Sequence, residues 1–251
     1  MNHPSPFPKI ALCLAAGILG LAPAQAALTH RYSFNDGAAR DSVGKIDAKL
    51  KGAGASVVEG KLVLKNDDAA SGDSISHLEF AGSVLPKSGS VSLVMWFTTK
   101  GTGPFARLVN FGASEGTEGT HFIYLSPNAA DSSARAAITG SDVSSKTAVD
   151  FTAMDDGKPH VVALIVDGAA KKLRVILDGR ESAVAAPLGE NTLDKVKPLE
   201  NWLGKSSFSA DPGLNATIDE FRVYDHALTL EEAVALHQAG ADALPAKPAA
   251  N

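Results

Sequence analysis

The sequence has few of the residues that support covalent or thiolate chemistry. Its 251 residues include a single cysteine, Cys13, close to the amino terminus. If that end is removed on export, the remaining chain can form no disulfide and has no thiolate for catalysis or metal binding. The seven histidines are dispersed, with no pair at the spacing of a zinc site. Stability must then come from a sizeable hydrophobic core, as expected for a chain of this length.

Residues 1–26 have the pattern of an export signal. Lys9 precedes an apolar run from Ile10 to Ala22, and Ala24-Gln25-Ala26 provides a small-x-small cleavage site. We therefore expect a periplasmic or secreted protein without a transmembrane segment in the mature chain, since the run is short for a membrane span. A transmembrane anchor is the alternative. A lipid on Cys13 is disfavoured because the bulky Leu12 precedes it.

The charge balance excludes one class of partner. The formal net charge is −5, and acidic and basic residues are interspersed along the chain without long blocks of one sign. No basic stripe is present that would attract a phosphate backbone or an anionic membrane surface. We expect no nucleic-acid partner.

Short alternating strands separated by Gly, Asp, Asn and Ser follow from Ala27 onward, which predicts a sandwich or barrel. Asp167-Gly168 and Asp178-Gly179 are hairpin signals. Only one segment has clear helical periodicity, beginning after a capping box at Thr229 and Glu232 and ending at Gly240. We expect an all-β fold, a two-sheet antiparallel jelly-roll sandwich with one short C-terminal helix, forming a single domain over 27–242. The tail, 243–251, is predicted to be disordered, and 67–76 and 112–119 are predicted to be surface loops.

Several sequence segments share their order with a known family. They are HRYSF (30–34), ARDSVG (39–44), SVSLVMWFTT (90–99), HVVALIVDG (160–168), NWLGKSSF (201–208) and IDEFRVYDHAL (218–228). Their succession resembles a bacterial laminin-G-like, concanavalin A-like jelly-roll domain. The resemblance implies a curved two-sheet fold that binds glycans or extracellular proteins, often with a structural calcium ion.

The calcium prediction rests on this resemblance. In similar domains the first turn and the last long strand meet beside the ion, which points to Asp41, Gly44 and Asp219. Carboxylates and the carbonyls of a glycine turn are suitable ligands for Ca²⁺. The alternative is that Asp41 caps its own turn and Asp219 pairs with a neighbouring strand.

Catalytic motifs of related enzymes are absent from the sequence. No Glu-x-Asp-x-Glu arrangement of the glucanase type and no Gln-x-His strand of the lyase type is present. A Gly-x-Ser-x-Gly match centred on Ser114 is followed by another strand pattern, whereas a nucleophile elbow must lead into a helix. We predict no catalytic residue.

Aromatic side chains are scarce, with two tryptophans and three tyrosines. Trp96 and Tyr124 are the candidate ligand-binding residues because a ring face can stack on a sugar, and Tyr32 and Trp202 are further candidates. In a sandwich such residues more often belong to the core. The predicted function is an exported, non-enzymatic module that binds a glycan or mediates surface adhesion. The alternatives are a protein-binding or structural module, or an enzyme with unfamiliar catalytic residues.

Overall fold

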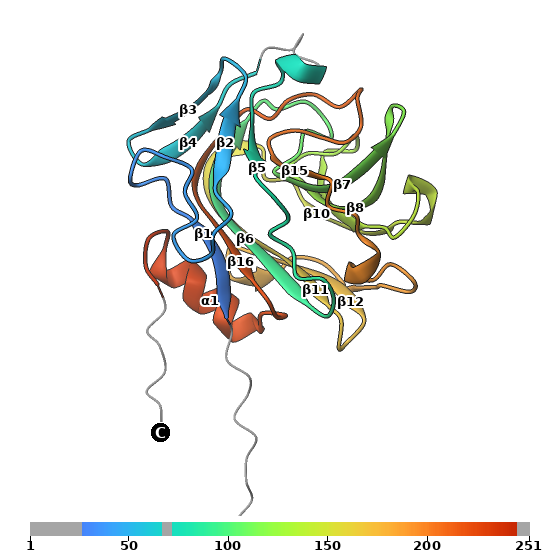
Figure 1. Ribbon diagram of the computed structural model, residues 1–251. Helices are drawn as coiled ribbons and strands as arrows, with labels where there is room; N and C mark the ends of the chain where they lie inside the picture. The colour runs from blue at the N-terminus through green and yellow to red at the C-terminus, as the bar shows by residue number, and fades with distance from the viewer. Residues whose placement is uncertain (1–26, 67–71, 245–251) are drawn as a thin grey trace, which may run out of the picture.

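The computed structural model describes residues 27–66 and 72–244, which fold into two antiparallel sheets packed face to face (Figure 1). Sheet A has nine strands in the order β13-β12-β11-β6-β16-β4-β3, with β1 on β16 and β14 on β12. Sheet B has seven strands in the order β10-β9-β8-β7-β15-β5-β2. The predicted jelly-roll sandwich is confirmed.

The strands of sheet A are β1 (Leu28–Tyr32), β3 (Ala55–Val58), β4 (Lys61–Leu64), β6 (Val91–Lys100), β11 (Asp156–Asp167), β12 (Lys172–Leu177), β13 (Arg180–Glu181), β14 (Ala186–Pro187) and β16 (Ala216–Tyr224). Those of sheet B are β2 (Ala48–Lys51), β5 (His77–Phe80), β7 (Val109–Glu115), β8 (Glu118–Ser126), β9 (Ser133–Ile138), β10 (Thr147–Thr152) and β15 (Glu200–Leu203). Three 3₁₀ turns lie in the connections, η1 (Gly72–Ser74), η2 (Val143–Ser145) and η3 (Leu193–Lys195).

The main hydrophobic core lies between the sheets. Alternate residues of the long strands point inward, so that Met95 and Phe97 of β6 face Phe111 and Ile123 of sheet B in one cluster. Phe221 of β16 lies near the ring of Phe111, with 6.4 Å between centroids. This core leaves the opposite face of each sheet for other contacts.

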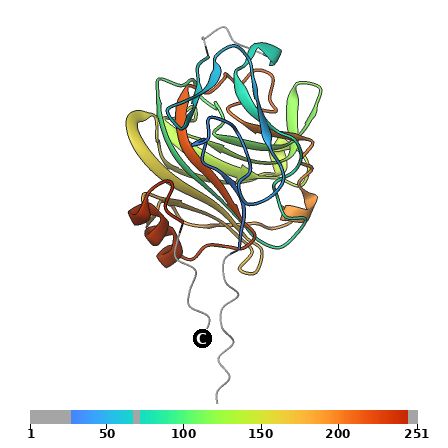
Figure 2. The ribbon, with the colours of Figure 1, turned by 60° about the vertical axis from the view of Figure 1, so that its left-hand side comes forward.

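The single helix, α1 (Leu230–Ala239), has the predicted capping box at Thr229 and Glu232. Its buried Ala233 and Leu236 pack with Val94 and Trp96 in one cluster on the outer face of sheet A. In Figure 2 the helix lies at the side of the molecule, outside the two sheets. Gly240 follows with φ of 79°, a conformation that glycine adopts without strain, and its N–H caps the carbonyl of Leu236. The outer face of sheet A is therefore covered by the chain itself.

Two predicted turns are confirmed, and one predicted loop is wrong. Asp178 and Gly179 both have positive φ in the tight turn between β12 and β13, and Asp167-Gly168 begins the turn between β11 and β12. The segment 112–119 is not a surface loop, because most of it lies in the hairpin of β7 and β8 with a turn at Gly116. Glycine is needed at 112 and 119 because a Cβ at either position would lie 2.6 Å from the side chain of Phe122 or Phe208.

A β-bulge at Asp219 changes the predicted face of one side chain in β16. Simple alternation places Ile218 with Glu220, Arg222 and Tyr224 on one face. In the structure Ile218 pairs with Phe97 and Glu220 with Trp96, so Asp219 is the extra residue and Ile218 joins the core.

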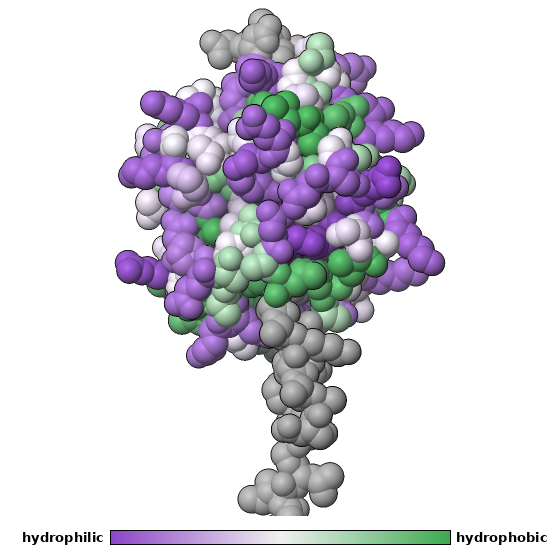
Figure 3. Space-filling model, turned by 90° about the vertical axis from the view of Figure 1, so that its left-hand side faces the viewer, coloured by the Kyte–Doolittle hydropathy of each residue, from purple (hydrophilic) through white to green (hydrophobic). Residues whose placement is uncertain are grey.

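Hydrophilic side chains cover most of the face shown in Figure 3, with apolar side chains exposed between them. Among the described residues no helix is long and apolar enough to cross a bilayer. The predicted signal, 1–26, and residues 245–251 of the predicted tail lie outside the described residues.

Candidate functional site

The outer face of sheet B carries the predicted Tyr124 in a row of cross-strand neighbours. Antiparallel partners share a face, so the register places six side chains in one line from β10 to β5. The row consists of Ala148, Ala137, Tyr124, Asn110, Trp202 and Glu79. Tyr124 and Trp202 thus lie on the same face, separated by Asn110.

The segment 204–211 lies over the middle of this row. The Asn110 side-chain amide donates to Ser207 Oγ at 2.6 Å and accepts from the Ser207 N–H at 3.3 Å. Ser206 Oγ donates to Asp211 Oδ2 at 2.6 Å and accepts from the Phe208 N–H at 3.1 Å, which closes the loop on itself. These bonds hold Phe208 above sheet B.

Beside this segment is a pocket of about 220 Å³. It is lined by Phe105, Arg107, Tyr124, Arg135, Val143, Lys146, Phe208 and Asp211. The lining comes from the approach to β7, from β8 and β9, from the η2 region and from segment 204–211. We refer to it as the Tyr124 pocket.

Arg107 lies over the Tyr124 ring, with its guanidinium carbon 3.9 Å from the ring centroid. The residue is only 2% exposed, and its Nη2 forms an ion pair with Asp211 at 2.8 Å. Burial lowers the pKa of Arg107 and raises the pKa of Asp211, against the opposing effect of the ion pair on each. Its Nε has no hydrogen-bond partner among the described residues. Arg107 is therefore a buried cation with one carboxylate partner.

Phe105 adopts a backbone conformation that is rare for a bulky residue, with φ of 64°. Its N–H donates to the Asn128 carbonyl at 2.9 Å, and its own carbonyl accepts from Arg107 Nη1 at 2.5 Å. These two bonds keep a half-buried aromatic ring at the pocket. Such strain persists where the surroundings enforce it, and it often accompanies a binding site.

Phe208 approaches the sheet closely because Gly119 has no side chain. A Cβ at Gly119 would lie 2.6 Å from the Phe208 ring. Phe208 also meets Phe122 edge to face, with 5.7 Å between ring centroids. Phe105 and Phe208 were missed at the sequence level because both precede or follow strands and neither is a tryptophan or tyrosine. The sequence feature that could have pointed to Phe208 is its position at the end of the family-like segment NWLGKSSF.

Tyr124 lines this pocket, although only 2% of its surface is exposed. Burial raises the pKa of its hydroxyl. Trp202 lies outside the pocket, where Lys205 Nζ is 4.7 Å from its ring centroid. Tyr32 is fully buried in the core and donates its hydroxyl to the Ile46 carbonyl.

Trp96 lies on the other sheet, far from this arrangement. It is 5% exposed in the cluster beneath α1, and the Arg222 guanidinium carbon is 4.6 Å from its ring centroid. The alternation along β6 correctly separates Trp96 from the main core. Helix α1 covers that second face, so the position favours a structural role over direct contact with a ligand.

Asp41, the first predicted calcium ligand, is surrounded by hydrogen-bond donors. Its Oδ1 accepts from the backbone N–H groups of Gly44 at 2.8 Å, Arg31 at 3.1 Å and Val43 at 3.3 Å. Its Oδ2 accepts from the Ile46 N–H at 3.1 Å and lies 2.6 Å from His30 Nδ1. Burial alone raises the pKa of Asp41, but these bonds outweigh it, and the pKa falls below its ordinary value.

Asp219, the second predicted calcium ligand, forms an ion pair with Lys61 of the neighbouring strand β4. A cation needs free oxygen lone pairs, whereas Asp41 points both oxygens at N–H groups and Gly44 contributes an N–H. Within 27–66 and 72–244 no group of three or more His, Cys, Asp or Glu residues could hold a metal. The donor set at Asp41 does not fit Ca²⁺, and the geometry favours the alternative of a capped turn and a strand pair.

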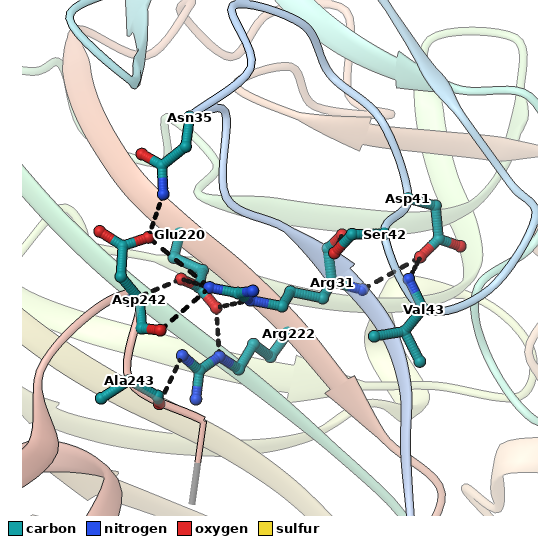
Figure 4. A network of polar contacts seen from close by, with 9 residues as sticks. All are labelled: Arg31, Asn35, Asp41, Ser42, Val43, Glu220, Arg222, Asp242 and Ala243. Carbon is teal, nitrogen blue, oxygen red and sulfur yellow. Dashed lines mark hydrogen bonds and ion pairs between the residues drawn. The ribbon is translucent and has the colours of Figure 1, made fainter.

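A second polar cluster surrounds Glu220 on the outer face of sheet A (Figure 4). Arg31 donates from Nε and Nη2 to the two Glu220 oxygens at 2.7 and 3.0 Å, and Arg222 Nε also donates to Glu220. The Asp242 N–H donates to Glu220 at 2.8 Å, and Arg222 Nη2 donates to the Ala243 carbonyl at 3.0 Å. This cluster fastens the chain after α1 to β1 and β16.

The Tyr124 pocket does not have the carboxylate pair of a usual glycosidase among its described lining residues. Asp211 is the one carboxylate among the described residues that line the Tyr124 pocket, and it is paired with Arg107. Glycosidases of the usual kind need two carboxylates flanking the substrate. Ser114 lies at the end of β7, donates to Glu200 at 2.6 Å and is followed by β8, so the helix required by a nucleophile elbow is not present there.

Two packed antiparallel sheets with a terminal helix define a lectin-type jelly roll. The family model Laminin_G_3, of the concanavalin A-like lectin/glucanases superfamily, matches residues 72–234, and the chain belongs to this family. No curated protein sequence matches the chain.

Three solved structures with similar folds illustrate the range of this architecture. Domain 4 of AbnA, a GH43 extracellular arabinanase from Geobacillus stearothermophilus, is 20% identical with a TM-score of 0.58, covering 84% of this chain and 98% of that domain. The CBM40 of the Ruminococcus gnavus IT-sialidase is 18% identical with a TM-score of 0.50, covering 59% and 83%. The Trypanosoma rangeli sialidase is 16% identical with a TM-score of 0.58, covering 87% of this chain and 34% of the sialidase. At these identities the likeness establishes the fold.

Proposed function

We propose that the protein is an exported glycan-binding module without catalytic activity and that its ligand occupies the Tyr124 pocket. The observation that carries the proposal is an aromatic-lined pocket of about 220 Å³ on the outer face of sheet B. Rings that present an apolar face next to directional polar groups are the usual means of holding a sugar. Phe105 and Phe208 are the half-buried rings, and Arg107 and Asp211 provide fixed polar groups beside them.

Similar structures support a glycan as the ligand. The arabinanase domain was solved with arabinotriose, and the Ruminococcus gnavus CBM40 was solved with α2,6 sialyllactose. The single lining carboxylate, already paired, supports binding without turnover.

The test is a glycan-binding screen with the mature domain, followed by calorimetry on Phe208→Ala. Removing a stacking ring should weaken binding about fivefold to tenfold, because such contacts contribute about 1 kcal/mol. Val184→Ala is the control, since Val184 is 93% exposed and does not line the pocket. Binding that survives Phe208→Ala unchanged, or an absence of binding to any glycan, would contradict the proposal.

Two further measurements test the remaining parts. Release of reducing ends or unsaturated uronates from plant, algal or bacterial polysaccharides, abolished by one Asp or Glu substitution, would make the protein an enzyme. Intact-mass analysis should give an exported form that begins at Ala27. Retention of Cys13, with or without a lipid, would contradict soluble export.

A further inference from the structure

The charges around the Tyr124 pocket are unequal in sign. Of the lining residues, Arg107, Arg135 and Lys146 are cationic and Asp211 is the one anion. This contrasts with the whole chain, whose net charge is −5. Arg107 pairs with Asp211 and Arg135 pairs with Asp150, so Lys146 is the lining cation without an ion-pair partner among the described residues, and its charge favours an anionic ligand at that place.

The side chain of Arg107 is held in the wall of the pocket by bonds to other residues. Its Nη1 donates to the Phe105 carbonyl and its Nη2 pairs with Asp211, while its guanidinium stacks on Tyr124. It contributes a fixed positive charge at low dielectric, where electrostatic interactions are stronger than in water.

Arg135 is held from one side only. Its Nε and Nη2 donate to the two oxygens of Asp150 at 2.5 and 2.8 Å, across the pair of strands β9 and β10. The side chain remains 23% exposed, and its guanidinium carbon lies 5.7 Å from the Phe105 ring centroid. Because Nε and Nη2 bond to Asp150, Nη1 of Arg135 can donate to another acceptor.

Lys146 forms fewer polar contacts with the described residues than Arg107 or Arg135. Its Nζ donates to the Val143 carbonyl at 3.2 Å, and it forms no ion pair with any residue in the described part of the chain. An ammonium group has three donors, so two remain. Lys146 follows η2 directly. The nearby Asp142 carboxylate accepts from the N–H groups of Ser144 and Ser145 at the start of η2 and forms no ion pair with Lys146.

We propose that the Tyr124 pocket recognises a sugar residue that carries a carboxylate. The carboxylate accepts hydrogen bonds from Lys146 Nζ and Arg135 Nη1, and the apolar face of the ring lies against Phe105 or Phe208. Charge-assisted bonds of this kind are about twice as strong as neutral ones. The inference rests on the proposed glycan-binding function and narrows it to acidic sugars, either a nonulosonate or a uronate.

The experiment compares matched acidic and neutral ligands by calorimetry. Sialyllactose is paired with lactose, and an oligogalacturonate is paired with its methyl ester and with arabinotriose. We expect at least one acidic ligand to bind about tenfold more tightly than its neutral partner, and to weaken as ionic strength rises from about 0.01 to about 0.15 M. The arm that shows the difference identifies the source of the carboxylate.

Lys146→Gln is the decisive variant, with Lys172→Gln as its control because Lys172 is exposed at the start of β12, on the other sheet. Lys146→Gln should weaken the acidic ligand about tenfold and the neutral one less than about twofold, and Lys146→Arg should restore most of the loss. Lys172→Gln should change neither. Melting curves of all variants report whether folding is retained.

The outcomes separate the two proposals. If neutral glycans bind as tightly as acidic ones and Phe208→Ala weakens the binding of both, the charge inference fails and glycan binding stands. If Lys146→Gln weakens acidic and neutral ligands equally, the carboxylate contact is also refuted. If neither kind of ligand binds, both proposals fail.

Discussion

Each sheet places an arginine over an aromatic ring on its outer face, and the pair on sheet B lines the Tyr124 pocket. Arg222 lies over Trp96 on sheet A, and Arg107 lies over Tyr124 on sheet B. Both arginines are almost fully buried. On sheet A the cluster of Trp96 includes Leu236 of α1, and the chain that follows the helix is bonded to Arg222. On sheet B the segment 204–211 covers the neighbouring Asn110, and its Phe208 and Asp211 form one wall of the Tyr124 pocket.

The carboxylates beside the two arginines have pKa values shifted in opposite directions. Burial alone raises the pKa of Glu220, but the bonds from Arg31 and Arg222 outweigh it, and the pKa falls below its ordinary value. Burial also raises the pKa of Asp211, and here the one arginine does not reverse it. The charged form of Glu220 is thus favoured by two arginines, whereas the single arginine beside Asp211 does not offset the effect of burial on that carboxyl.

The largest expected effect comes from breaking the closed cluster. Glu220→Gln keeps the shape of the side chain but leaves the charges of Arg31 and Arg222 without their shared carboxylate, and all three groups are buried or largely buried. We expect a loss of about 3–5 kcal/mol in the free energy of unfolding, measured by urea denaturation. Asp219→Asn is the matched control, because its partner Lys61 is 47% exposed, and it should cost less than about 1 kcal/mol. Equal losses in the two variants would contradict the distinction between a buried, shared carboxylate and an exposed ion pair.

The two aromatic positions should separate stability from binding. Trp96→Ala removes a buried ring beneath α1 and should lower the free energy of unfolding by about 3–5 kcal/mol while leaving glycan affinity unchanged in the folded fraction. Phe208→Ala should cost less in stability, since its ring is half-buried, and should weaken binding. Urea denaturation and calorimetry on both variants measure the two effects. A Trp96→Ala protein with normal stability and weakened binding would place the ligand on sheet A.

Strand periodicity and motif order were enough to predict the sandwich, the helix and the hairpin turns, because these depend on local alternation and turn residues. The bulge at Asp219 was not predictable, because inserting one residue changes pairing without changing local composition. Trp96 was correctly placed off the main core face. An amphipathic helix needs an apolar surface to pack on. The sequence of α1 together with the partly apolar second face of β6 could therefore have predicted that Trp96 is buried beneath the helix.

The Tyr124 pocket was predictable only in part. Tyr124 itself was a candidate because its ring can stack on a sugar, but Phe105, Arg135, Lys146 and Phe208 belong to four separate segments. Their meeting depends on long-range pairing and on the bond between Asn110 and Ser207, and no spacing in the sequence encodes either. For Asp41 and Asp219 the sequence offered both a shared calcium ion and separate partners, and the choice between them needed the observed bonds of Asp41 to its own turn and of Asp219 to Lys61.

The pH dependence of stability should differ in sign between the two clusters. Glu220 has a folded pKa below its unfolded value, so its contribution is present above the unfolded pKa and is lost as the pH falls through the folded pKa. Asp211 has a folded pKa above its unfolded value, so the folded state binds the proton first and its contribution increases as the pH falls through that window. Denaturation between pH 7 and about pH 3 should therefore show a shallower acid loss in Glu220→Gln and a steeper one in Asp211→Asn, relative to the parent. Identical pH slopes in both variants would show that neither carboxylate behaves as its surroundings imply.

The smallest expected effect concerns calcium, which the resemblance to related domains predicts and the donor set at Asp41 does not fit. Both oxygens of Asp41 already accept from N–H groups, so an ion there would have to displace several hydrogen bonds. A ligand that binds only the folded state raises the melting temperature by mass action, so we expect added Ca²⁺ or a chelator to shift it by less than about 1 °C. Asp41→Asn should by contrast lower the melting temperature with or without Ca²⁺, because one amide oxygen cannot accept all of these bonds. A rise in melting temperature with Ca²⁺ that Asp219→Asn abolishes would restore the calcium hypothesis and would require the loop 41–46 to rearrange around the ion.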